Sequence, residues 1–411
     1  MNLPLSTEKM LAILIASFSI GVAAIGGASV SISNHNRVIM GVQSDGQTLS
    51  GMTENEVRHF FTEKARAKLK KDAVLVTAGQ KQWKISPKDI DLAPDVEGAV
   101  QEAYGTGRGH SLFRNMAEQM KLALVGQNVK LTATYDEAKL QQKCNDIAGE
   151  LAAQPANASL SLAANGVIER HAATIGRKAD ADAVVAEAGP KLQSLALTVH
   201  AEIPIEEAQP PVTDADLASV DSILGEYSTH YYPGARGQNI AIAAGKLNGA
   251  FIRSTGTFSF NDTVGARTRD AGYQTAGVIL DGRPAQDIGG GVCQVSSTLY
   301  NAVLLAGLKT TVRTSHACPS SYCPPGRDAT VADGLLDFQF QNQLAHGVYL
   351  LASANGTDLT IYVLGTKADL GGKTVQLESD GSRLHPSVYR LYLAGGQVVE
   401  KEFLHTDSYS T

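Results

Sequence analysis

The sequence predicts an α+β protein with an N-terminal membrane anchor. Three observations support this fold class. An uncharged apolar stretch lies at residues 11–31, short strand and helix patterns alternate between residues 38 and 205, and a helix led by three glycines follows near residue 290. The chain has 411 residues, which is enough for two or three domains with cores of their own.

The anchor is predicted from the length of the uncharged stretch Leu11–Ser31, which follows Lys9. About 20 apolar residues at a rise of 1.5 Å cover a bilayer core of roughly 30 Å. A signal peptide usually has a shorter apolar core, of about 7–15 residues. We therefore expect an uncleaved, single-pass anchor over residues 1–33, with the bulk of the chain outside the cytoplasm.

The region after the anchor begins with a clear helix start. Thr53 suits the N-cap position and Glu56, three residues later, suits its capping-box partner. A hairpin is predicted from Ala73 to Ile85, followed by a helix over residues 94–104. The same order of strand, turn, strand and helix recurs, with a weaker pattern, from Leu160 to Ala188. The recurrence predicts a duplicated small α+β module.

The remaining boundaries follow from prolines and turn signals. Pro204, Pro210 and Pro211 indicate a linker, and the turn Ala394–Gln397 between strand patterns predicts a C-terminal β-hairpin. The predicted organisation is an anchor over 1–33, the α+β region over 38–205, a linker over 206–218, a mixed α+β domain over 219–366 and a β extension over 367–411.

The most informative segment is the run of Gly289, Gly290 and Gly291 before a helical pattern that stops near Gly307. Cys293 therefore falls at a helix N-terminus, where unpaired N–H groups and the helix dipole favour a thiolate. The alternative is a small buried hydrophobe under a tight turn.

A histidine follows the next predicted strand, which covers Thr310–Arg313. A cysteine nucleophile needs an imidazole in reach and a carboxylate to orient that imidazole. We expect Cys293 as nucleophile and His316 as base, with Asp328 or Asp337 as the orienting group. The N–H groups near the glycines would stabilise an oxyanion. The alternative for His316 is a hydrogen bond within its loop.

The chain holds four cysteines. Outside the cytosol, Cys318 and Cys323 are spaced to close a small disulfide loop. A zinc site that combines them with His316 fits no familiar ligand spacing, so no metal and no cofactor are expected. The formal net charge of −6 argues against a nucleic-acid partner.

The second half of the chain resembles the VanW family, which is named after an accessory protein of some vancomycin-resistance clusters. The matching pieces are Asn239–Ala241, Lys246–Gly249, Phe258–Asn261, Gly272–Tyr273, the run 289–307, and Tyr322 with 324–331. The chain departs from the family at Ser254–Thr257, where Pro-Gly-Glu is usual. The resemblance implies a role in the cell envelope more firmly than a reaction.

The first half resembles the peptidoglycan-binding domain that precedes VanW regions. The carrying residues are Gly41–Val42, the turn 46–53 and the segment Gln82–Ser86. Trp83 would stack on a sugar ring, or else fill a half-buried core position. The resemblance implies peptidoglycan, or a lipid-linked precursor, as partner.

Three functions compete at this point. The chain is a peptidoglycan-binding envelope protein, a cysteine-dependent amide hydrolase or transpeptidase, or an anion cradle built on the glycine loop. The cradle lacks the lysine that phosphate loops carry. Ligand contacts are expected from the following residues: Gly289, Gly290, Gly291, Gln294, Tyr273, Tyr300, Asn301, Tyr322 and Arg327.

Overall fold

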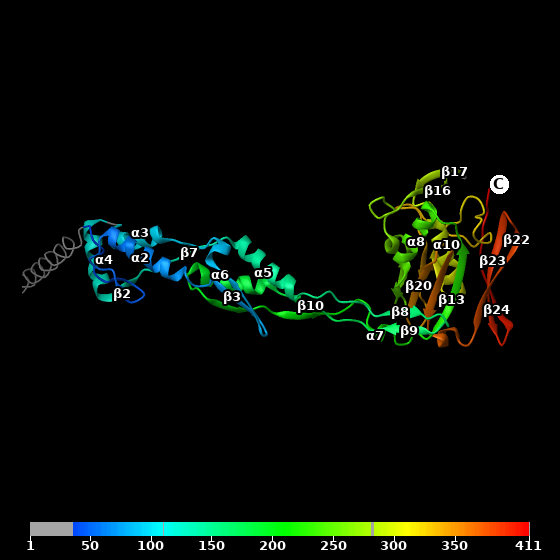
Figure 1. The fold of residues 1–411 in the computed structure, drawn as a ribbon, viewed down its shortest axis with the longest axis horizontal. Coiled ribbons are helices and arrows are strands. Elements are labelled where there is room, and N and C mark those ends of the chain that lie inside the picture. Colours follow the sequence, from blue (N-terminus) through cyan, green and yellow to red (C-terminus); the bar gives the residue numbers. More distant parts are fainter. Residues whose placement is uncertain (1–35, 110, 281–282, 411) are drawn as a thin grey trace, which may run out of the picture. The chain divides into compact units, whose positions relative to one another are not determined.

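The computed structural model describes residues 36–109, 111–280 and 283–410. The fold is α+β, as predicted, with many small sheets. The chain divides into two compact units (Figure 1). Of the described residues, one unit contains those from 36 to 154 together with 177–208, and the other contains those from 155 to 176 and from 209 to 410.

The first unit is built on a three-stranded sheet in the order β11-β3-β4. β11 runs parallel to β3, and β3 pairs with β4 in the predicted hairpin. Helix α2 begins at the predicted capping box of Thr53 and Glu56. It buries Val57 and Phe61 in the core of this unit, because these positions repeat on one helical face.

The elements of the first unit are β1 Val42–Ser44, β2 Gln47–Thr48, α2 Glu54–Lys68, β3 Val74–Ala78, β4 Lys81–Ile85, the 3₁₀ turn η1 Pro87–Ile90, β5 Ala93–Pro94, α3 Val96–Gly105, α4 Leu112–Val125, β6 Gln127–Asn128, β7 Ala133–Thr134, α5 Glu137–Leu151, β10 Gly176–Ala179, α6 Ala181–Gln193, β11 Val199–Glu202 and β12 Ile205–Ala208.

The second unit is built on an antiparallel sheet in the order β13-β21-β20-β14. Helix α10 packs on β13 and β21, and α8 packs on β20 and on α10 (Figure 1). Nearly every residue of α10 is buried, including its polar ones. The helix is therefore fixed on all sides, which gives the residues at its N-terminus a rigid base.

The elements of the second unit are β8 Ser159–Leu162, β9 Ile168–His171, α7 Asp214–Leu217, β13 Ser222–His230, α8 Ala235–Leu247, β14 Phe251–Ile252, β15 Thr257–Ser259, α9 Phe260–Val264, β16 Thr275–Leu280, β17 Arg283–Ile288, α10 Val292–Leu305, β18 Lys309–Val312, β19 Gln339–Gln341, β20 Val348–Ala354, β21 Asp358–Gly365, the 3₁₀ turn η2 Lys367–Leu370, β22 Thr374–Ser382, β23 His385–Ala394 and β24 Gln397–Thr406.

The two hairpins of the predicted repeat belong to different sheets and to different units. The hairpin β3–β4 joins β11 in the first unit, whereas the hairpin β8–β9 stands as a two-stranded sheet and belongs to the second unit. The predicted linker contains β12 and helix α7 at its two ends. The duplication and the domain boundaries stay predictions.

The sequence predicts an element at each end of the chain, a C-terminal hairpin and an N-terminal anchor. The C-terminal hairpin is present as β23 and β24, and β22 extends it to three strands. The predicted anchor over residues 1–33 lies outside the described residues. Within the described ranges, none of the helices is both long and apolar enough to cross a bilayer.

Candidate active site around Cys293

The three glycines are required by close backbone packing. Gly289 and Gly291 have positive φ angles of 82° and 110°, a region that glycine enters without strain. A Cβ atom on Gly290 would lie 2.7 Å from the carbonyl group of Ala276 in β16. The loop therefore lies tightly against β16, and any larger residue at position 290 would push it away.

The loop places Cys293 as the second residue of α10. Val292 and Gln294 donate their N–H groups to the carbonyls of Gly289 and Gly291. The N–H of Cys293 makes no hydrogen bond within the described chain. A free N–H beside a thiol at a helix start can stabilise an oxyanion on an acyl group that is attached to that sulfur.

The Cys293 thiol is half-buried and contacts an imidazole. Its Sγ donates to the carbonyl of Val331 at 3.4 Å. The imidazole of His316 lies close enough to interact with this thiol, and the interaction lowers the pKa of Cys293. The structure thus brings together two residues that are 23 positions apart in the sequence.

His316 is fixed by the buried carboxylate of Asp328. Its Nδ1 lies 2.5 Å from Asp328 Oδ2, and its backbone N–H donates to the same oxygen at 2.7 Å. The side chain of Asp328 is 1% exposed. The bond through Nδ1 leaves Nε2 as the ring nitrogen that can serve the thiol, and the hydroxyl of Tyr322 lies 3.4 Å from that nitrogen. The order of contacts is therefore thiol, imidazole, carboxylate.

The electrostatics favour a charged thiolate–imidazolium pair. Burial raises the pKa of Cys293, but the hydrogen bond and charge of His316 outweigh burial and lower it. Burial lowers the pKa of His316, but Asp328 and Cys293 together raise it to about 9. Burial raises the pKa of Asp328, and hydrogen bonds from His316 and Tyr409 lower it overall. Each group thus favours the charged form of its neighbour.

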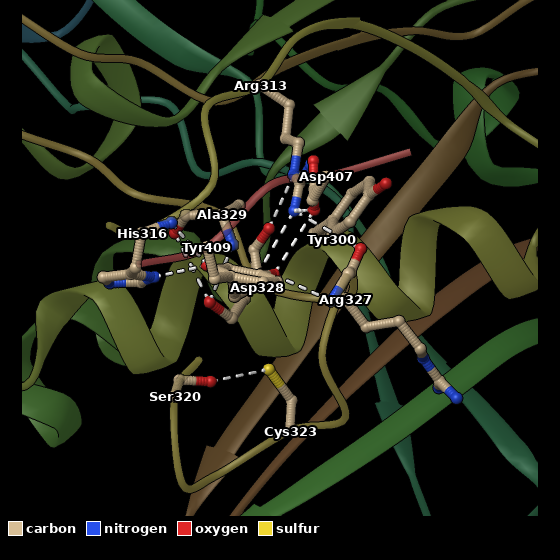
Figure 2. A network of polar contacts seen from close by, with 12 residues as sticks. Tyr300, Arg313, His316, Ser320, Cys323, Arg327, Asp328, Ala329, Asp407 and Tyr409 are labelled. Atoms are coloured by element: carbon tan, nitrogen blue, oxygen red, sulfur yellow. Dashed lines mark hydrogen bonds and ion pairs between the residues drawn. The ribbon is translucent and has the colours of Figure 1, made fainter. Parts of the chain in front are cut away.

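Asp328 also belongs to a wider polar network (Figure 2). Arg313 lies 3.3 Å from Asp328 Oδ1, and it bonds both carboxylate oxygens of Asp407 at 2.6 Å. The hydroxyl of Tyr409 donates to Asp328 Oδ1. The carboxylate in contact with His316 is therefore held from its other side by an arginine and a tyrosine.

Side chains of α10 hold the segment that carries Asp328. Ser296 Oγ donates to the carbonyl of Ala329 at 2.6 Å, and Ser297 Oγ accepts from Ala329 N–H at 2.9 Å. Asn301 donates to the carbonyl of Arg327 at 2.7 Å. The polar residues after Cys293 thus fix the position of the carboxylate relative to the thiol.

Several predicted ligand residues have structural partners. Gln294 is 2% exposed and bonds Thr229, the carbonyl of His230 and Arg236. Tyr300 is 1% exposed and packs edge-on against Phe338. Their roles as ligand contacts stay predictions, and both are already engaged within the core.

The other predicted ligand residues differ in their burial and in their hydrogen-bond partners. Asn301 is fully buried and accepts a hydrogen bond from Arg327 Nε at 2.6 Å. Tyr322 adjoins His316. Tyr273 is 2% exposed, and its hydroxyl has no partner among the described residues. Of this group, Tyr322 is the one that the structure brings beside the imidazole.

Asp337, the alternative orienting group, is engaged elsewhere. It accepts hydrogen bonds from Ser259, from the N–H of Asn261 and from Gln339. The residues that sequence reasoning missed are Arg313, Asp407 and Tyr409. The last two lie about 80 residues beyond Asp328, so no local spacing could have indicated them.

The remaining cysteines are unlike Cys293. All four cysteines are free thiols, so the structure does not contain the predicted Cys318–Cys323 disulfide. Burial raises the pKa of Cys323 to about 12 and that of Cys144 to about 11. Among the described residues, no cluster of three or more histidine, cysteine or acidic side chains could hold a metal ion.

Comparisons with known proteins fit both halves of the chain. Residues 235–364 match the family described as "VanW like protein", and residues 83–195 match the "Putative peptidoglycan binding domain". The chain carries a VanW-like domain. It also carries a domain that matches the second of these families. Both resemblances predicted from the sequence are therefore confirmed.

Two curated proteins are similar to this chain. The uncharacterized protein YoaR of Bacillus subtilis is 41% identical over 163 residues, which cover 39% of this chain and 54% of YoaR. The vancomycin B-type resistance protein VanW of Enterococcus faecalis is 26% identical over 183 residues, which cover 41% of this chain and 66% of that protein. The matches thus span about half to two thirds of these relatives. No solved structure matches the chain.

Proposed function

We propose that this protein is a cysteine-dependent acyltransferase or hydrolase of the cell wall that acts on peptide amide bonds of peptidoglycan. The observation that carries the proposal is the place of the Cys293 thiol beside His316, which lowers its pKa and whose imidazole is bonded to the buried Asp328. A buried, oriented imidazole beside a thiol of lowered pKa is the arrangement that nucleophilic catalysis requires.

The reaction would proceed in two balanced steps. The Cys293 thiolate attacks the amide carbonyl carbon, a C–S bond forms, and the N–H of Cys293 stabilises the oxyanion. His316 Nε2 gives its proton to the amine nitrogen as the C–N bond breaks, which leaves a thioester. Water or a second amine then attacks the thioester and gives a proton back to His316. The C–S bond breaks, so the acid or new amide leaves and the thiolate is restored.

The substrate class rests on the family matches. A peptidoglycan-binding domain in the same chain would hold the polymer near the thiol, which raises its effective concentration. In this unit Trp83 donates to Glu150 at 2.9 Å and is half-buried. We further propose that residues 11–31 anchor the protein in the cytoplasmic membrane as a single-pass helix, with both units on the outer side.

A binding role without chemistry is the second candidate, and the match of residues 83–195 favours it. In that case the polar contacts at Cys293 would serve the fold alone. The two candidates differ in whether peptidoglycan is altered or only retained.

The test uses the full-length chain in detergent with purified peptidoglycan. Muropeptides released or newly crosslinked by the parent would be identified by mass spectrometry. Cys293→Ser is expected to abolish turnover while it still sediments with peptidoglycan. Cys144→Ser, a matched change at the buried cysteine of the first unit, is expected to turn over at the parental rate if it folds. Parental turnover by Cys293→Ser would refute the proposed nucleophile, and binding without products in every protein would favour the second candidate.

A further inference from the structure

We infer that the C-terminal segment after β24 completes the active site, with Tyr409 and Asp407 as positioning residues that hold Asp328 for His316. This inference rests on the proposed function. The family match ends at residue 364, so these residues lie outside it. They reach the site from a different part of the chain.

The two oxygens of Asp328 are divided between two sets of donors. Oδ2 accepts both hydrogen bonds from His316. Oδ1 accepts from Arg313 and from the hydroxyl of Tyr409. With both oxygens occupied, rotation of the carboxylate would break bonds on each side, so His316 keeps one orientation.

The Tyr409 hydroxyl also ties the carboxylate to its own loop. It accepts from the N–H of Gly326 at 2.7 Å while it donates to Asp328. Tyr409 is 5% exposed. The tyrosine therefore bridges two points of the segment 326–328 from inside the protein, away from solvent competition.

Asp407 acts through the charge of Arg313. Both side chains are less than a tenth exposed, and Asp407 takes two hydrogen bonds of 2.6 Å from the guanidinium. Without Asp407, Arg313 would face Asp328 as its one acidic partner in this network and would compete with His316 for it. Asp407 thus sets how much of the arginine's charge reaches the carboxylate of Asp328.

Backbone hydrogen bonds hold the segment in place. Asp407 and Tyr409 donate their N–H groups to the carbonyls of Pro386 and Leu384, and Ser410 donates to the carbonyl of Ala317, the residue after His316. His405 Nε2 lies 2.9 Å from the carbonyl of Gly326. The segment is therefore attached both to β23 and to the loop that carries His316. Figure 2 shows the side chains of Asp407 and Tyr409 beside Asp328.

The titratable groups around this carboxylate come from several elements. They are Arg313, His316, Tyr322 and Cys323 of the loop after β18, Cys293 and Tyr300 of α10, and His405, Asp407 and Tyr409 of the C-terminal strand and tail. The pKa of the Cys293 thiol depends on His316, and the pKa of His316 depends on Asp328. A substitution at Tyr409, which bonds Asp328, should therefore change the pKa of a thiol that it does not contact.

The experiment measures the alkylation rate of Cys293 by iodoacetamide against pH, by mass spectrometry of its peptide, in the full-length chain. The variants are Tyr409→Phe, which removes one hydroxyl, Asp407→Asn, and a truncation after Thr406. The matched control is Tyr389→Phe in β23, whose ring packs on Phe403. Circular dichroism melting identifies the variants that remain folded.

Tyr409→Phe is expected to move the alkylation midpoint up by about one pH unit, so the rate on the acid side of the midpoint falls about tenfold. Asp407→Asn should shift it in the same direction, and the truncation should shift it furthest. Tyr389→Phe should stay within twofold of the parent. A folded Tyr409→Phe and a folded Asp407→Asn with parental profiles would overturn the inference. A shifted profile in a protein that never alters peptidoglycan would refute the proposed reaction and leave the positioning role intact.

Discussion

Cys293 and Cys144 lie on helices of similar length in the two units, yet the two thiols have opposite properties. Cys144 lies in the middle of α5, fully buried among aliphatic side chains, and burial raises its pKa to about 11. Cys293 is also close to a hydrophobic core, but His316 lowers its pKa. Burial and helix membership are therefore not what activates a thiol here. The activating difference is the imidazole of His316, oriented by Asp328, beside a thiol at a helix start.

Alkylation at pH 7 gives the largest expected contrast between the two thiols. A thiol with a pKa near 11 is about one part in 10⁴ thiolate at pH 7, and Cys144 is also enclosed. We expect Cys293 to be modified at least 10³ times faster, as measured by peptide mass spectrometry after a timed iodoacetamide pulse. Equal rates in the folded protein would break the comparison.

Replacement of the imidazole should make Cys293 resemble an ordinary thiol. His316→Ala is expected to lower turnover by about 10²–10⁴ and to move the alkylation midpoint toward higher pH, because the general base and its charge are lost. His346→Ala is the matched control, since His346 pairs with Asp369 at 2.9 Å but is half exposed. The comparison fails if both variants lose activity to the same degree.

The ion pair of Asp407 with Arg313, beside Asp328, should make the stability of the protein sensitive to acid. Burial raises the pKa of Asp407, but the nearby His405, 3.6 Å from Oδ2, and the hydrogen bonds from Arg313 outweigh burial and lower it to about 2. A lowered folded pKa contributes stability above about pH 4 that is lost as the pH falls through 2. Asp407→Asn is expected to lose about 2 kcal/mol of unfolding free energy at pH 7, and part of the parental decline between pH 4 and 2. Urea titrations at pH 7 and pH 3 measure both quantities. An unchanged free energy at pH 7 would contradict the assignment.

The smallest effect is expected at Cys144. Cys144→Ala should cost about 1 kcal/mol of stability through lost packing and should leave peptidoglycan turnover within twofold of the parent. Denaturant unfolding followed by the turnover assay measures both. Loss of turnover in a folded Cys144→Ala would show that the first unit contributes more than packing.

Local patterns predicted much of this structure. The capping box of Thr53, the hairpin β3–β4 and the helix after the glycines each depend on residues within a few positions of one another, and each is present. The sequence also predicted Cys293 and His316, with Asp328 or Asp337 as the orienting group, because a helix start and the following strand are short-range signals. That the three side chains meet is a property of the folded chain.

The positions of Asp407 and Tyr409 depend on long-range strand pairing, which local patterns do not predict. Asp407 and Tyr409 reach Asp328 only after β22, β23 and β24 have paired, and strand register sets which side chain faces the loop. The sequence predicts ligand contacts from polar residues of α10, and in the structure Gln294 and Asn301 bond backbone carbonyls around them. Sequence shows that a buried helix is polar but not which carbonyls its side chains will find.

The hairpin β8–β9 has a practical consequence for dissecting this protein. Ala158 and Leu160 share a small apolar cluster with Val212, Tyr349 and Leu364, although residues 177–208 of the intervening chain belong to the first unit. A fragment that begins at the VanW-like match would lack Ala158, Leu160 and Val212, and would expose the rest of that cluster to solvent. A fragment designed for expression should therefore retain residues 155–176, either by keeping the whole chain or by rejoining the two pieces with a short artificial connector.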